Sequence, residues 1–286
     1  MDIKKVLDEL DKLFAEKRSG EAENFLKGKL REAEEVDDYN SIITLVNELI
    51  GFYRVSSQYN NAMVYSDYII SLMESLELNN TIPFATTLLN IATAYRAAGK
   101  SEEALEYYEQ VLPIYNEKLA ADDFRFASLY NNISLVYQEL NKYEKSCECL
   151  EKALSIAKEN KAEIEAATTH ANLGISLMKL DKVNEAIKHI EKSLTIFEKD
   201  EGQKDFHYPS ALAAMGEAQF KLKNYEKAIE YYLKSLNEIK ANIGENKSYA
   251  ITCENLSLAY KEAGNTEASQ KYYESAKNAK AKLGLI

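Results

Sequence analysis

The sequence predicts an all-α fold, built as a stack of about seven antiparallel helical hairpins, and three observations lead to this prediction. Gly and Pro number only 10 and 3 among 286 residues, so the chain has few of the turns that an all-β fold needs. The hydrophobic fraction of 46% is high enough for a packed core, so disorder is not expected. One segment also recurs along the chain at a nearly constant spacing.

The recurring segment aligns five times without an internal gap. Successive copies begin 40–42 residues apart, and they lie at 88–112, 130–154, 170–194, 212–236 and 253–277. A period between about 20 and 50 residues is the sequence signature of a protein whose structural units stack on one another. We therefore interpret other motifs by their position in the repeat.

Each copy is expected to form two helices joined by a short polar break. The apolar spacing of Leu88, Ile91 and Tyr95 is typical of one helix face, and a second such face begins at Ala104. The breaks fall at one equivalent position, occupied by Gly99, Asn141, Asp181, Lys223 and Gly264. One position of each helix is always small, which favours close packing of the pair. These small residues are Ala92, Ser134, Gly174, Gly216 and Ser257 in the first helix and Ala104, Ser146, Ala186, Ala228 and Ser269 in the second.

These copies resemble the tetratricopeptide repeats. One copy matches the family pattern at Leu212, Met215-Gly216, Ala228, Tyr232 and Ser235, although Gln219 stands where Tyr is usual and the chain has no Trp. The period of 40–42 residues resembles that of the long repeats in kinesin light chains. The resemblance implies a right-handed superhelical solenoid in which the first helix of each hairpin lines a concave inner wall.

The repeat register predicts a single solenoid over residues 1–286. We expect a divergent first hairpin at 1–38, in which Leu10, Leu13, Ala22, Leu26 and Leu30 take core positions. The six repeats that follow are expected at 39–80, 81–122, 123–162, 163–204, 205–245 and 246–286.

Composition argues against two classes of partner. The 35 Lys and Arg against 46 Asp and Glu give a net charge of −11, whereas nucleic-acid binding usually requires a basic face. No apolar run approaches the ~18 residues of a membrane span, and the N-terminal segment is charged rather than an apolar signal. We therefore expect a cytoplasmic protein that binds neither nucleic acid nor membranes.

The residues that most often carry chemistry fall at packing positions of the repeat. Cys147 and Cys149 align with apolar or aromatic residues of the other copies, and Cys253 and His170 share one mostly apolar column. A structural zinc site needs about four closely spaced nitrogen or sulfur ligands, which three scattered His and three such Cys do not offer. The sequence thus predicts no metal, no cofactor and no enzymatic activity.

A polar column inside the first helices is the strongest candidate for binding. It contains Asn90, Asn132, Asn172 and Asn255, although Asn is a mediocre helix former. A carboxamide offers both a donor and an acceptor, as an extended peptide backbone does. The long-repeat relatives use such an Asn ladder to hold peptides, and the resemblance implies this role here. The alternative, left open by the sequence, is that each Asn bonds to the neighbouring hairpin and stiffens the stack.

Positions that share this helix face complete the predicted peptide groove. Arg54 and Arg96 make its N-terminal part cationic and suited to an acidic group, whereas its C-terminal part is more apolar. The predicted site comprises Asn47, Arg54, Asn90, Arg96, Asn131, Asn132, Gln138, Asn172, Ile175, Met178, Phe220 and Asn255.

Three functions fit these features. The first is a non-enzymatic scaffold that binds a peptide segment of a partner protein in the groove. The second is a regulatory protein similar to the helical-repeat receptors of bacterial signalling peptides; those receptors usually add an N-terminal module for which 1–38 is too short. The third is a homodimer formed through the apolar C-terminal end of the stack.

Overall fold

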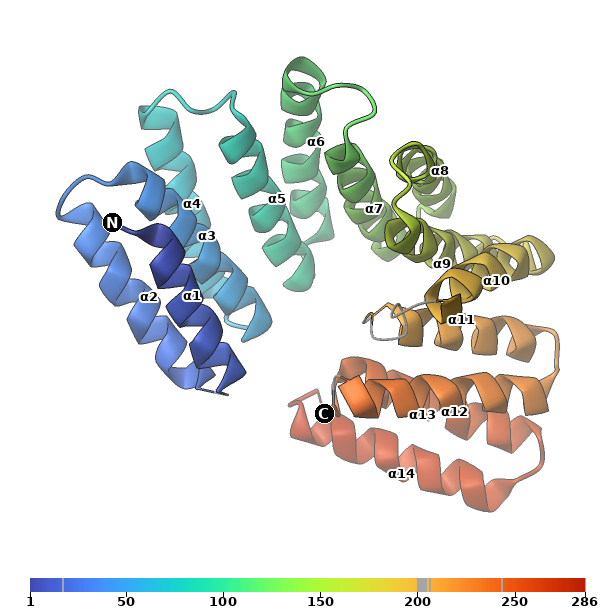
Figure 1. The fold of residues 1–286 in the computed structure, drawn as a ribbon. Coiled ribbons are helices and arrows are strands. Elements are labelled where there is room, and N and C mark those ends of the chain that lie inside the picture. The colour runs from blue at the N-terminus through green and yellow to red at the C-terminus, as the bar shows by residue number, and fades with distance from the viewer. Residues whose placement is uncertain (17, 200–204, 206, 243, 286) are drawn as a thin grey trace. The chain divides into compact units, whose positions relative to one another are not determined.

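The structure is a computed structural model that describes residues 1–16, 18–199, 205, 207–242 and 244–285. Within these ranges it contains fourteen α-helices and no β-strand, which confirms the all-α prediction (Figure 1). The helices are α1 (Ile3–Ala15), α2 (Ser19–Glu34), α3 (Tyr39–Val55), α4 (Tyr59–Ser75), α5 (Ile82–Ala97), α6 (Ser101–Lys118), α7 (Phe124–Glu139), α8 (Tyr143–Glu159), α9 (Glu163–Lys179), α10 (Val183–Lys199), α11 (Tyr208–Lys221), α12 (Tyr225–Asn242), α13 (Lys247–Glu262) and α14 (Thr266–Lys282).

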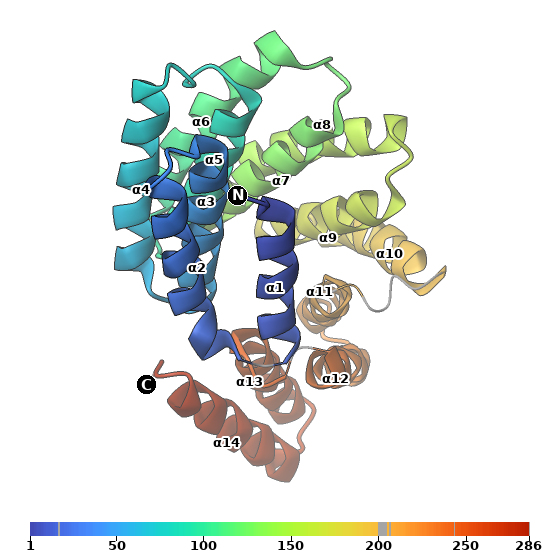
Figure 2. The same ribbon diagram turned by 60° about the vertical axis from the view of Figure 1, so that its left-hand side comes forward.

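The chain divides into two compact units, unit 1 (Met1–Ala121) with helices α1–α6 and unit 2 (Asp122–Ile286) with helices α7–α14. In each unit every helix packs on the next in sequence, as the hairpins α1–α2 and α13–α14 show in both views (Figure 1, Figure 2). First helices of successive hairpins also touch one another: α3 meets α5 in unit 1, and α7, α9, α11 and α13 form a row in unit 2. These rows carry the predicted binding positions.

The unit boundary lies one residue before the expected repeat boundary between residues 122 and 123. The end of the expected 163–204 repeat lies outside the described residues. That the whole chain forms one continuous solenoid stays a prediction.

The polar breaks all adopt the same backbone conformation. Gly99, Asn141, Asp181, Lys223 and Gly264 have positive φ values between 56° and 80°. In each case the backbone N–H of the following residue donates to the carbonyl five residues earlier, as from Lys142 to Tyr137. This bond closes the first helix in the way that a left-handed residue after a helix end commonly does. The break position was therefore predicted correctly in all five copies.

The small positions hold the two helices of a hairpin close together. Ala92, Ala104, Ser134, Ser146, Ala186 and Ala228 are fully buried. A Cβ atom placed on Gly174 would lie 2.4 Å from Ile190 Cγ1, and one on Gly216 would lie 2.7 Å from the Tyr232 ring. In the last hairpin, Ser257 Oγ donates to the Ser269 carbonyl over 2.9 Å. Only small side chains fit at these contacts.

Candidate functional site

In unit 1 the predicted Asn residues bond to one another between hairpins. Asn47 on α3 donates from Nδ2 to Thr87 Oγ1 on α5 over 2.9 Å, and also to the carbonyl of Ile43. Asn90 on α5 donates in turn to Asn47 Oδ1 over 2.7 Å. The carboxamides of Asn47 and Asn90 thus join two neighbouring first helices, as the stacking alternative requires.

Unit 2 repeats this bridge between α7 and α9. Asn131 donates to Thr169 Oγ1 over 2.8 Å, and Gln138 donates to Ser176 Oγ over 2.9 Å and to the Asn172 carbonyl. Asn132, in contrast, bonds within its own helix to the Ser128 carbonyl, and its side chain makes no other hydrogen bond in the described ranges. Asn131 and Gln138 are therefore stacking residues.

The last two members of the Asn column are different. Among the described residues, the side chains of Asn172 on α9 and Asn255 on α13 form no hydrogen bond, and both are half-buried. Each carboxamide therefore keeps a donor and an acceptor for another molecule.

Asn255 lines a groove over the first helices of unit 2, which we call the α9–α11–α13 groove. Its volume is about 270 Å³. The lining residues are Ile175 and Lys179 of α9; Pro209, Ser210, Ala213, Ala214 and Glu217 of α11; Ser235 and Ile239 of α12; and Ser248, Ile251, Thr252 and Asn255 of α13. Pockets for drug-sized molecules are usually larger, about 300–1,000 Å³, so the groove suits one or two side chains of a segment laid across it.

At the groove, the hydrogen-bonded bridge seen between α3 and α5 and between α7 and α9 is replaced by small side chains. Thr252 occupies the repeat position of Thr87 and Thr169, which accept the bridging hydrogen bonds in the earlier hairpins. The residue at the matching donor position is Ala213 instead of Asn, and the next residue, Ala214, replaces the Asn of the polar column. Two methyl groups stand where carboxamides would otherwise project, and the space between α11 and α13 stays open.

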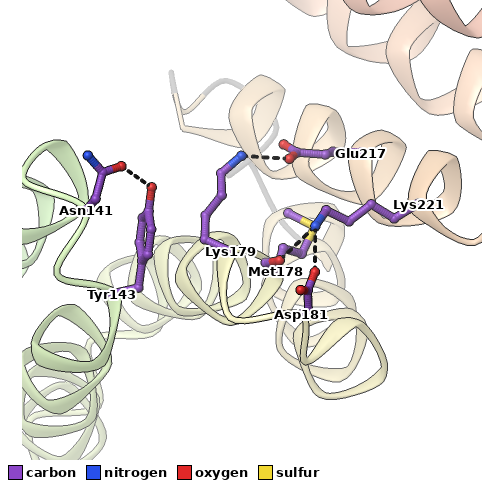
Figure 3. Close-up of polar contacts among 7 residues, drawn as sticks. All are labelled: Asn141, Tyr143, Met178, Lys179, Asp181, Glu217 and Lys221. Carbon is purple, nitrogen blue, oxygen red and sulfur yellow. Dashed lines mark hydrogen bonds and ion pairs between the residues drawn. The ribbon is translucent and has the colours of Figure 1, made fainter.

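The rim of the groove is polar and carries a fixed ion pair. Lys179 Nζ lies 2.9 Å from Glu217 Oε1, and both side chains are partly exposed (Figure 3). Beside this pair, Lys221 Nζ donates to the Met178 carbonyl over 3.0 Å and contacts Asp181 (Figure 3). These contacts tie α11 to α9. The lining also contains the apolar residues Pro209, Ile239 and Ile251, of which Ile251 is 44% exposed.

Two residues predicted for the groove do not offer their side chains to it. Met178 is fully buried in the core of unit 2, so its side chain is not exposed to the groove. Phe220 is half-buried and packs its ring against Tyr225, with centroids 5.4 Å apart. Ile175 does line the groove.

The two predicted arginines lie in unit 1, away from the α9–α11–α13 groove in sequence. Arg54 lines a separate cleft beside α1 and α2. Arg96 is half-buried in the last turn of α5.

His170, Cys147, Cys149 and Cys253 are buried or partly buried, in agreement with the packing role that the sequence predicts for them. His170 on α9 and His189 on α10 face each other, with their Nδ1 atoms 2.9 Å apart. Burial, assisted by the neighbouring His189, Lys192 and Lys158, lowers the pKa of His170 to about 4. Burial likewise raises the pKa of the Cys147 and Cys149 thiols to about 11 each. In the described ranges no three His, Cys, Asp or Glu side chains gather as metal ligands.

Several groove residues were missed from the sequence, above all Ala213, Glu217 and Ile251. Ala213 lies one residue before the polar column and Glu217 three residues after it, both on the chosen helix face. The sequence did contain one indication of these groove residues: the Asn column is interrupted by Ala214, in the hairpin that lines the groove.

No helix in the described ranges is long and apolar enough to cross a membrane.

No curated protein matches the sequence. Solved structures that share the fold include the following three. The apo form of RapI is 19% identical, with a TM-score of 0.73 and 99% of each chain covered. A Rap protein in complex with competence and sporulation factor is 13% identical, with a TM-score of 0.71 over 98% of this chain and 76% of that chain.

The kinesin light chain TPR-like repeats of Podosopora anserina are 19% identical, with a TM-score of 0.53 over 69% of this chain and 95% of that chain. One tetratricopeptide repeat profile matches residues 125–199, 165–237 and 208–282, and a second profile of that description matches residues 84–124. Because these matches cover more than half of the sequence and agree with the helical hairpins, the chain belongs to the tetratricopeptide repeat family.

Proposed function

We propose that the protein is a non-enzymatic interaction protein that binds an extended peptide segment of a partner in the α9–α11–α13 groove. The observation that carries this proposal is the opening at Ala213 and Ala214, next to the unbonded carboxamide of Asn255. An apolar side chain of the peptide fits over the alanines and Ile251. The carboxamide of Asn255 then bonds to the peptide backbone, which offers a carbonyl and an N–H at regular intervals.

The polar groups around the groove support binding instead of catalysis. Lys179 and Glu217 are paired with each other, and the remaining polar side chains are hydroxyls and a carboxamide. Such groups fix the position of a ligand by hydrogen bonds.

We propose a cytoplasmic location and a protein or peptide partner, without nucleic acid or membrane. A homodimer through α13 and α14 remains a further proposal, supported by the exposed side chains of Leu258 and Tyr273.

The test uses short peptides selected from a phage-displayed library against the immobilised full chain. We expect the variant Ala213→Asn to rebuild the bridge to Thr252, fill the opening and reduce the affinity of groove-bound peptides about tenfold or more. The matched control is Ala241→Asn on an exposed position of α12, which should leave the affinity unchanged. Selected peptides that bind Ala213→Asn as tightly as the wild type would overturn the proposal.

A second pair of variants tests the carboxamide. Asn255→Ala removes one hydrogen-bonding group, and about 1 kcal/mol corresponds to roughly a fivefold loss of affinity. Asn237→Ala on the exposed face of α12 is its control. Far-UV circular dichroism should give the same thermal midpoint for both variants.

The likeness to the Rap protein in complex with competence and sporulation factor favours a second candidate function, a sensor of bacterial signalling peptides. A sensor changes conformation when it binds, whereas a scaffold does not need to. X-ray scattering with and without a selected peptide separates the two: a large compaction favours the sensor, and an unchanged radius of gyration favours the scaffold.

A further inference from the structure

Unit 1 contains a larger opening than the groove of unit 2, which we call the α1–α3 cleft. Its volume is about 780 Å³. It lies between the C-terminal turn of α1, the N-terminal part of α2 and the second half of α3. The lining residues are Phe14, Gly20, Glu23, Glu48, Gly51, Phe52, Arg54, Val55, Ser56 and Gln58. Phe14 and Val55 are 43% and 76% exposed, so the cleft has uncovered apolar walls.

Two glycines line this cleft without a packing reason. A Cβ atom added to Gly20 on α2 or to Gly51 on α3 would meet no atom within 4 Å. At Gly174, in contrast, an added Cβ would collide with Ile190. A glycine inside a helix costs stability relative to alanine. Gly51 therefore contributes no close contact, and its missing side chain enlarges the cleft.

The cleft also holds a carboxylate without a partner. Glu48 occupies the repeat position at which other hairpins have Asn, and it is half-buried. Among the described residues it makes no hydrogen bond or ion pair. Burial, together with the nearby charge of Asp11, raises the pKa of Glu48. A cation placed beside this carboxylate would relieve both effects.

The other charged groups around the cleft do not satisfy Glu48. Glu23 is already bonded, because its Oε1 accepts from Lys27 Nζ at 2.7 Å and from the Tyr53 hydroxyl at 2.9 Å. Arg54 is on the same helix as Glu48 but six residues further on, about 9 Å along the axis.

We propose that the α1–α3 cleft binds an arginine side chain from a segment of a partner protein, with its guanidinium paired to Glu48 and lying against Phe14 and Phe52. Arginine fits better than lysine because its planar guanidinium can pair with a carboxylate through two hydrogen bonds and stack on an aromatic ring. This site goes beyond the proposed function, since it lies in the other unit and selects a charged side chain instead of an apolar one.

The experiment measures binding of acetyl-Ala-Arg-Ala-amide to the full chain by NMR, with signals of labelled Phe residues as the readout. The comparison peptide is acetyl-Ala-Gln-Ala-amide, which has a similar length but no charge. We expect the arginine peptide to bind about tenfold or more tightly than the glutamine peptide. Equal binding of the two peptides would overturn the proposal.

Two variants locate the site. Glu48→Gln keeps the shape and removes the charge, and it should abolish the preference for arginine, whereas the control Glu74→Gln on the exposed face of α4 should keep it. Gly51→Leu fills the cleft, so the arginine peptide should no longer bind while the thermal midpoint stays equal or rises. Arginine binding that survives Glu48→Gln or Gly51→Leu would contradict the assignment. Ala213→Asn should leave this binding unchanged, which separates the outcome from that of the α9–α11–α13 groove.

Discussion

Replacing Gly174 by alanine tests the packing of the hairpins in a quantitative way. The new Cβ atom would lie 2.4 Å from Ile190 Cγ1, 3.0 Å from Ile190 Cδ1 and 3.2 Å from the Ala186 carbonyl oxygen. Carbon atoms pack best at about 3.5–4.0 Å, so Ile190 or one of the two helices must move by about 1 Å. Ile190 is fully buried and branched at Cβ, and it has little freedom to turn away.

The expected loss of stability follows from two opposing effects. Overpacking a core typically costs about 1–3 kcal/mol, and the short distance puts Gly174→Ala near the upper end of that range. Alanine in place of a helical glycine recovers roughly 0.5–1 kcal/mol. We therefore expect Gly174→Ala to lower the free energy of unfolding of unit 2 by about 2 kcal/mol.

Gly51→Ala is the matched control, because Gly51 is also in a first helix but has open space at its Cβ position. It should raise the free energy of unfolding by roughly 0.5–1 kcal/mol. Urea titrations followed by far-UV circular dichroism measure both changes, and hydrogen exchange locates them. A loss of 2 kcal/mol corresponds to roughly 30-fold faster exchange of the most protected amides in α9 and α10. If Gly174→Ala were as stabilising as Gly51→Ala, the close approach of the two helices would be refuted.

Three further results are expected. Asn131→Ala removes the bridge to Thr169 and should lower the free energy of unfolding of unit 2 by about 1 kcal/mol in urea titrations. Asn132→Ala removes only a described bond within one helix and should lower the free energy of unfolding by less. Equal losses for the two variants would contradict the bridging role of Asn131. The pKa of His170 is lowered to about 4 in the folded chain. As the pH falls below ~6.5, the unfolded chain takes up a proton at His170 while the folded chain does not. The contribution of neutral His170 to stability is therefore present above pH ~6.5 and is lost between pH ~6.5 and about pH 4. This contribution is on the order of 3 kcal/mol. The free energy of unfolding of His170→Leu should therefore fall less steeply between pH 6.5 and 4 than that of the wild type. Parallel curves of stability against pH for the two proteins would argue against a neutral, buried His170. Finally, Cys147 should react slowly with iodoacetamide at neutral pH because its pKa is about 11, and alkylation at the rate of a free thiol, measured by mass spectrometry, would show an exposed thiolate instead.

The hairpins were predictable from the sequence because each depends on local information. The left-handed residues at the breaks and the small residues at the helix contacts recur in every copy, and the structure places them where the alignment does. Cys149 on α8 and His189 on α10 occupy the same position of the repeat, and both are partly buried.

The role of each Asn could not be predicted in the same way, because it depends on a residue about 40 positions away. Asn47 and Asn131 bridge hairpins only because Thr87 and Thr169 follow at the facing positions. Asn255 occupies the repeat position of Asn90, but the residue that would accept its hydrogen bond in the preceding hairpin is Ala213 instead of Asn. Its side chain therefore has no such bond among the described residues. Within the Asn column, Asn90 therefore takes part in stacking through Asn47, whereas the carboxamides of Asn172 and Asn255 remain available for a ligand in the described part of the chain.

The α1–α3 cleft was missed for a related reason. The first hairpin departs from the repeat pattern, so its residues had no equivalents with which they could be compared. Its helices pack through Leu10, Ala22, Leu26 and Leu30, but Phe14 lies beyond this core and is partly exposed. The shape of the cleft follows from that divergence and from Gly51, neither of which the repeat alignment explains.

The central claim, that a partner segment lies across the first helices of unit 2, is tested most directly by hydrogen exchange of the full chain with and without a selected peptide. Binding in the α9–α11–α13 groove should slow the exchange of amides in α9, α11 and α13 and leave α10 and α14 unchanged. Slower exchange confined to the second helices, or to unit 1, would contradict the claim.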